Sequence, residues 1–265
     1  MNFDGLQAGI LLPAFVAGLL VLATHVPLGA EVLRRGIIFM DLAIAQFAGL
    51  GIVAVHAFAG EAEGDDIWQA QAAAVGAALL GALLLRWTEK RAPQRQEALI
   101  GVSFVVAACA AILLLAKDPH GGEHMQALLV GQILWSTWLG LLPLTGISAA
   151  VLLLWFALRS TRVAPLAFYL LFALIVTASV QVVGVYLVFA SLIVPALASG
   201  GRLLPAWLIG AAGYAVGLIA SALFDLPAGA AIVLALAGCA LIGAMFLSRD
   251  AVRMRFGKTW WRREG

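Results

Sequence analysis

Residues 165–200 read PLAFYLLFALIVTASVQVVGVYLVFASLIVPALASG, and these 36 residues contain no charged side chain and no histidine. A helix of about 20 apolar residues crosses the roughly 30 Å hydrocarbon core of a bilayer. The stretch is therefore too long for one membrane helix. Gly184 and Pro195 are the residues at which a helix would break. We expect two short spans here, or one span with a broken or re-entrant helix near 182–200.

The rest of the chain is similarly apolar. Its 265 residues are 63% hydrophobic and 11% charged, with a mean hydropathy of +1.03, whereas soluble domains are about 25% charged. The stretch 126–158 is also long, and we expect a short interfacial helix from Met125 to Trp135 before a span that starts near Trp138. The other apolar stretches cover 7–26, 37–59, 67–86, 98–116, 204–224 and 227–247.

This pattern predicts an all-α, polytopic membrane bundle of eight or nine transmembrane helices that forms a single domain over residues 1–265. The alternating short strands of an outer-membrane barrel are not seen. Gly213, Gly217 and Ser221 recur at steps of four, which indicates close packing against another helix, either of this chain or of a second copy. Cys109 and Cys239 lie inside apolar runs and are interpreted as small buried hydrophobic residues.

The charged residues lie in the short connections, and their signs alternate. Four acidic residues gather at 61–66, and Asp225 lies in the connection 224–227. The basic residues follow the first, third, fifth and sixth stretches and fill the tail 249–265. Basic connections favour the cytoplasmic side. Nine helices would then place the N-terminus outside, and eight would place it inside. Trp260 and Trp261 in the basic tail indicate a membrane-surface anchor, not a nucleic-acid site.

Few ionisable residues fall inside the spans, where a charge is costly and is often functional. Asp41 follows Arg34 and Arg35 by one to two helical turns. It is either an interfacial carboxylate paired with one of those arginines, or a cation-attracting group on a water-filled path. Gln46 is either a contact between helices or part of the same path. His56 is an interfacial histidine or a ligand.

The polar connection 117–125 contains a second group of candidate ligands. His120, Glu123 and His124 lie close together with Asp118, and imidazoles with carboxylates bind Zn²⁺ or Mn²⁺. Their spacing fits no closed structural zinc site, so the alternative is a solvated loop. The chain has no Gly-x-x-x-x-Gly-Lys-Ser/Thr motif. We therefore expect no ATP hydrolysis by this chain, and energy would come from a partner or an ion gradient.

Five stretches, taken in order, resemble the membrane permeases of bacterial ABC importers for zinc and manganese. Asp41 follows Pro27-Leu28-Gly29 and Arg34-Arg35 as in the family's Pro-Leu-Gly … Arg-Arg … Asp pattern. The other four similar stretches are Glu97-Ala-Leu-Ile-Gly101, Leu129-Val-Gly-Gln-Ile133, Val182 to Ala196 and Asp225-Leu-Pro-Ala-Gly229.

The resemblance implies a permease of the bacterial inner membrane that carries a divalent metal, zinc or manganese, and binds no cofactor tightly. It implies a cytoplasmic ABC ATPase that binds ATP, an extracytoplasmic metal-binding protein and a second permease copy. The region from Pro195 to Arg202 would lie near the ATPase. One departure is that the family's Asp-x-x-x-His pattern has Ala45 at the histidine position here, with Gln46 next to it.

Three other functions remain open from the sequence. The chain could be a permease for a metal chelate, although such permeases are usually longer and have about ten spans. It could be a proton-coupled secondary transporter that uses Asp41, although no inverted pair of broken helices is seen. It could also be a membrane scaffold without transport.

Overall fold

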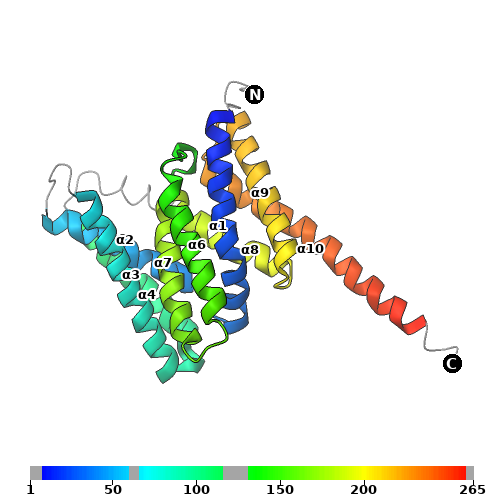
Figure 1. The fold of residues 1–265 in the computed structure, drawn as a ribbon, viewed down its shortest axis with the longest axis horizontal. Helices are drawn as coiled ribbons and strands as arrows, with labels where there is room; N and C mark the ends of the chain where they lie inside the picture. The colour runs from blue at the N-terminus through cyan, green and yellow to red at the C-terminus, as the bar shows by residue number, and fades with distance from the viewer. Residues whose placement is uncertain (1–7, 60–65, 116–130, 261–265) are drawn as a thin grey trace.

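The computed structural model of the protein describes residues 8–59, 66–115 and 131–260. Most of this part of the chain is helical (Figure 1). Two short 3-10 helices, η2 (Pro93–Arg95) and η3 (Ile133–Trp135), lie in the connections. The α-helices are α1 (Ala8–Arg35), α2 (Met40–Ala59), α3 (Asp66–Arg91), α4 (Gln96–Leu115), α6 (Leu141–Leu158), α7 (Ala164–Val183), α8 (Val185–Ala198), α9 (Leu203–Phe224) and α10 (Ala228–Trp260).

Seven helical segments of the described chain are long and apolar enough to cross a membrane, and α8 and residues 40–55 of α2 are shorter apolar helices. The predicted all-α polytopic membrane bundle is therefore confirmed. Burial is uneven among the segments, with 67% of the α7 segment inside the protein but only 17% of the α10 segment. Peripheral helices such as α4 and α10 therefore expose apolar faces that lipid or another protein would cover.

The long apolar stretch 165–200 breaks at Gly184, as the sequence predicted. Gly184 has φ 81° and ψ 161°, a backbone conformation that side-chain-bearing residues rarely adopt. Helix α7 therefore ends before this glycine, and α8, which has only 14 residues, begins after it. Pro195 does not break the chain, because it lies inside α8 and its ring is buried. The one hydrogen bond that a proline removes is tolerated in this tightly packed helix.

The connection before α6 differs from the expected interfacial helix. Its described part contains only the 3-10 turn Ile133–Trp135, and α6 starts at Leu141; residues 125–130 lie outside the described residues. Gly131 has φ 70°, and a Cβ atom there would lie 2.2 Å from the carbonyl carbon of Val183. This connection therefore passes directly over the break between α7 and α8.

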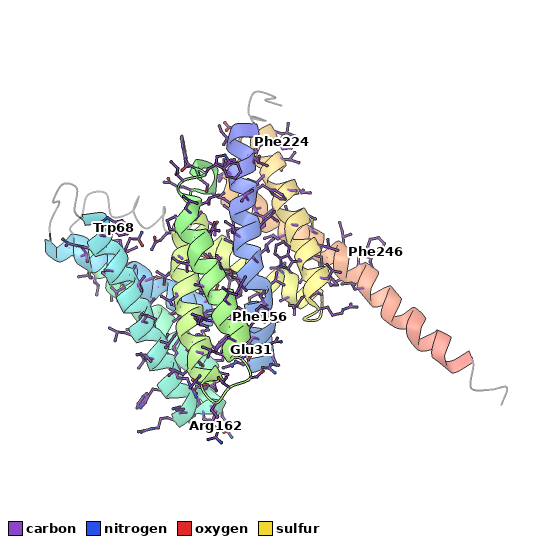
Figure 2. All side chains as sticks on the ribbon, viewed as in Figure 1. Glu31, Trp68, Phe156, Arg162, Phe224 and Phe246 are labelled. Carbon is purple, nitrogen blue, oxygen red and sulfur yellow. The ribbon has the colours of Figure 1, made fainter. Side chains whose placement is uncertain are left out.

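The basic connections gather at one end of the bundle. One groove is bordered by the end of α1, the α6–α7 turn and the α8–α9 turn. The α3–α4 turn lies at the same end, because Arg86 of α3 stands over the ring of Tyr169 near the start of α7. Glu31, Phe156 and Arg162 lie toward this end in Figure 2, and Phe224 lies toward the opposite end. We refer to them as the basic end and the opposite end.

Small residues set how closely the helices approach. A Cβ atom on Gly217 would lie 2.4 Å from Cα of Ile232, and one on Gly213 would lie 2.8 Å from Cα of Leu236. The predicted packing stripe of α9 therefore contacts α10 of the same chain. Gly29 likewise lets α1 approach α8 closely, because a Cβ atom there would lie 2.0 Å from the carbonyl oxygen of Leu192 in α8.

Candidate functional site

The candidate site begins at the start of α2. Helix α1 ends at Arg35. The φ of 67° at the following Gly36 lets the Ile37 N–H donate back to the carbonyl of Val32 at 3.3 Å, an arrangement typical of helices that end before a glycine. The chain reverses and α2 begins at Met40, so Asp41 lies in its first turn. Asp41 is 1% exposed, and its Oδ1 atom has no hydrogen-bond partner.

The interpretation of Asp41 as the partner of a nearby arginine is wrong. Arg35 Nε donates to Glu31 Oε1 at 2.7 Å, and Arg34 donates to Glu31 Oε2 at 2.5 Å. The Arg35 guanidinium also stands 4.2 Å from the centre of the Phe168 ring. Glu31 was not singled out from the sequence, although its spacing of three and four residues from the arginines is the spacing of helical ion pairs.

An open cavity of about 830 Å³ lies between α2, α4, α8 and α10, and its lining residues Ile112, Tyr186 and Leu234 are exposed. Its polar side chains are those of Gln46 and Tyr186, and the rest of its lining is apolar, including Phe104, Phe189 and Val233. We call it the central cavity. The structure therefore places Gln46, one of the predicted path residues, at an opening inside the membrane region.

Asp41 and Gln46 do not share a face of α2. Five residues advance a helix by about 500°, so the two side chains point about 140° apart. Gln46 and Leu42 line the central cavity, but Asp41 does not. Ala45 lies on the side of α2 that carries Asp41 and is buried. The carboxylate is thus enclosed by protein, whereas the amide borders the cavity.

The other predicted ligands cannot be placed at this site. His56 lies in the last turns of α2, but its side chain is outside the described residues, and so are His120, Glu123 and His124. Among the residues whose positions are described, no three His, Cys, Asp or Glu side chains come together as a metal site would require.

The predicted ATPase-coupling region borders a second opening, of about 1010 Å³, at the basic end. We call it the basic groove. One wall is the α8–α9 turn, which includes Ala196 and Gly200, and the opposite walls carry Glu31, Arg34, Arg35 and Arg159. Pro195 is buried in the last turn of α8. Arg202 is exposed at the start of α9, and its Nε atom donates to the Ser199 carbonyl at 3.1 Å.

These features define a polytopic helical membrane protein with a cavity between its helices and a charged groove at one end. Residues 7–247 match the model of the ABC 3 transport family, so the chain belongs to that family. The protein slr2045 of Synechocystis, described as an uncharacterized membrane protein, is 27% identical to it, and the match covers 92% of both chains.

Two solved structures share the fold. PsaBC from Streptococcus pneumoniae, in complex with Fab, has a TM-score of 0.69 and 21% identity, and the match covers 91% of this chain and 93% of that one. An inward-facing structure described as a metal-chelate type ABC transporter has a TM-score of 0.60 and 19% identity, with 96% and 90% covered.

Proposed function

We propose that this chain is the permease subunit of an ABC importer that moves a divalent metal ion, zinc or manganese, across the bacterial inner membrane. The observation that carries the proposal is the central cavity, which lies between four helices of a chain that belongs to the ABC 3 transport family. The metal-chelate transporter of the same fold supports a metal cargo. The permease would contribute no catalytic residue, because ATP would be hydrolysed by a separate cytoplasmic ABC ATPase.

Gln46 and Asp41 would handle the cargo in different ways. The Gln46 amide oxygen borders the central cavity and is suited to a harder or partly hydrated cation. Asp41 leaves one buried oxygen without a partner, and a buried charge without a partner is costly. We infer that Asp41 meets the cation in another state of the transport cycle, after α2 has turned. His56 would lie farther along the same helix.

A metal chelate is the second candidate cargo, and the lining of the central cavity favours it. A bare divalent cation needs several oxygen, nitrogen or sulfur ligands, whereas this lining offers the polar groups of Gln46 and Tyr186. An organic ligand would bring its own donor atoms and would contact the apolar walls. Its transport would then depend less on Asp41.

The permease needs partners on both sides of the membrane. The basic groove, whose α8–α9 wall runs from Ala196 to Leu203, would receive the cytoplasmic ATPase, with Pro195 and Arg202 next to this wall. An extracytoplasmic metal-binding protein would deliver cargo at the opposite end, and His120, Glu123 and His124 would help to capture it. A second permease copy would cover the exposed apolar residues of α4 and α10, such as Val106 and Leu234, beside the central cavity.

The test is metal accumulation in cells that lack their own importers, with Zn²⁺, Mn²⁺ and Fe²⁺ compared side by side. Asp41→Ala should abolish uptake while membrane insertion and ATPase co-purification persist. Gln46→Ala should reduce uptake about tenfold, the effect of about 1.4 kcal/mol in binding. Gln94→Ala, which changes an exposed amide in η2, is the matched control. Normal metal uptake in Asp41→Ala would remove this carboxylate from the mechanism.

A further inference from the structure

Helix α1 contains a buried histidine that the proposed function does not use. His25 is 0% exposed, and its Nδ1 atom lies 2.9 Å from the carbonyl oxygen of Val21, one turn earlier in the helix. A carbonyl oxygen only accepts hydrogen bonds, so Nδ1 carries the ring proton and donates it. A charged imidazolium would be costly at this buried position. Nε2 is therefore a free acceptor, and it has no hydrogen-bond partner among the described residues.

A second polar contact joins α8 to α9. The hydroxyl oxygens of Ser191 and Tyr214 lie 2.8 Å apart, and both side chains are fully buried. Ser191 Oγ also lies 2.6 Å from the carbonyl oxygen of Leu187, to which it donates its single proton. The Tyr214 hydroxyl is therefore the donor in its contact with Ser191.

The glycines of α1 show which face of this helix meets α8 and α9. A Cβ atom on Gly18 would lie 2.2 Å from the ring of Tyr214 in α9, and one on Gly29 would lie 2.0 Å from the carbonyl oxygen of Leu192 in α8. His25 follows Gly18 by seven residues and precedes Gly29 by four. The three positions therefore lie within about 40° of one another around the axis of α1. His25 thus faces the same two helices.

The polar contact between α8 and α9 lies at the level of His25. Gly18 and Gly29 are about 16.5 Å apart along the axis of α1, at 1.5 Å per residue. The side chains of Tyr214 and Ser191 bridge this interval, because the Tyr214 ring lies against Gly18 and Ser191 directly precedes the residue that lies against Gly29. Their two hydroxyl groups therefore lie between the glycines, beside the turn of α1 that carries His25.

One O–H group thus lies near two acceptors. The Tyr214 hydroxyl has a single proton, which it donates to Ser191 Oγ, while Nε2 of His25 is left unpaired. An unpaired buried acceptor is costly. If the Tyr214 hydroxyl turned to His25 instead, Ser191 would keep its own hydrogen bond to Leu187. The two arrangements are therefore expected to be close in energy, as a two-state element requires.

We propose that the Tyr214 hydroxyl is a two-position switch between Ser191 and His25. Donation to Ser191 holds α8 against α9, whereas donation to His25 joins α9 to α1 and releases α8. One side of α8 lines the central cavity through Tyr186 and Phe189, and the end of α8 leads into the turn at the basic groove. The role of the switch in transport rests on the proposed function: ATP binding by the partner would favour the arrangement with His25.

Nitrogen-15 NMR of the full chain tests the switch, because an imidazole nitrogen that accepts a hydrogen bond resonates upfield of a free one. The chain has four histidines, and His25→Gln identifies the Nε2 resonance of His25. Ser191→Ala removes the competing acceptor, so this resonance should move upfield. Ser199→Ala is the matched control, because Ser199 is also buried and also donates to a backbone carbonyl, that of Ala196. It should leave the resonance unmoved.

Tyr214→Phe separates the switch from local repacking. Combined with Ser191→Ala, it removes the donor and should return the His25 resonance to its wild-type position. An unmoved resonance in Ser191→Ala, or a shift that persists in the double variant, would overturn the switch.

Nucleotide tests the role of the switch in the transport cycle. ATP with vanadate, added to the permease in complex with its ATPase, should move the His25 resonance upfield in the wild type but not in Tyr214→Phe. An unmoved wild-type resonance in this trapped complex would overturn the proposed role of ATP. An upfield shift in Ser191→Ala, in a permease that imports no metal, would support the switch and contradict the proposed function.

Discussion

Gly29 lets α1 pack directly against the backbone of α8, and Gly29→Ala is expected to force the two helices apart. The added Cβ atom would lie 2.0 Å from the Leu192 carbonyl oxygen, whereas ordinary contacts begin at 3.4 Å. The helices would therefore have to separate by about 1.4 Å (3.4 − 2.0), because both neighbours are backbone. Overfilling a packed interior in this way costs about 1–3 kcal/mol.

The consequence should be visible in both stability and transport. A loss of 1 kcal/mol lowers the melting temperature of a chain of this size by about 2–4 °C, so the expected decrease is about 2–12 °C. The assay follows detergent-solubilised protein by size-exclusion chromatography after heating. Metal uptake should fall as well, because α8 carries Phe189 and leads into the α8–α9 turn of the basic groove.

Gly146→Ala is the matched control, because this glycine lies on an exposed face of α6 with nothing within 4 Å of its added Cβ atom. Alanine favours a helix over glycine by about 0.5–1 kcal/mol, so the control should melt at or slightly above the wild-type temperature. A Gly29→Ala protein that melts with the control would show that α1 and α8 do not contact each other as described.

Two further variants test the surfaces assigned to partners. Arg159→Glu reverses a charge in the basic groove and should reduce the amount of co-purified ATPase several-fold. Arg162→Glu, in the same turn but outside the groove lining, should leave that amount unchanged. Equal amounts of ATPase with both variants would place the ATPase elsewhere. Deletion of residues 118–124 should raise the metal concentration required for uptake if the histidine pair captures cargo, and unchanged uptake would leave that connection a solvated loop.

The fold could be predicted from the sequence because lipid imposes simple rules. Length and polarity identify membrane helices, and the break at Gly184 follows from a stretch too long for one span. Pro195 could not be excluded as a break, because a proline inside a helix is tolerated only where packing compensates for the lost hydrogen bond. The helix that packs against the small residues of α9 also could not be predicted, because a pattern of small residues does not say which helix it contacts.

The orientation of α2 was less accessible to prediction. Asp41 and Gln46 are the first polar side chains of this helix, and they point about 140° apart. This angle does not say which of the two faces the cavity until the rotation of α2 about its axis is known. That rotation depends on distant residues. Phe47 fills the space left by Gly81, and a Cβ atom on Gly51 would lie 2.5 Å from the Ala73 carbonyl oxygen. These contacts turn Gln46 toward the central cavity and leave Asp41 enclosed.

Glu31 gives a physical reason why Asp41 lacks a cationic partner. Because Glu31 accepts hydrogen bonds from both Arg34 and Arg35, neither guanidinium neutralises the carboxylate a few residues farther along. A buried Asp–Arg pair would attract a passing cation weakly, since the two charges would cancel. On the proposed function, Glu31 therefore preserves the attraction of Asp41 for cargo. The cation could then reach this carboxylate only through a rotation of α2. The ring of Phe39, just before α2, stacks on that of Phe189 in α8 with centroids 6.3 Å apart, and this contact resists the rotation.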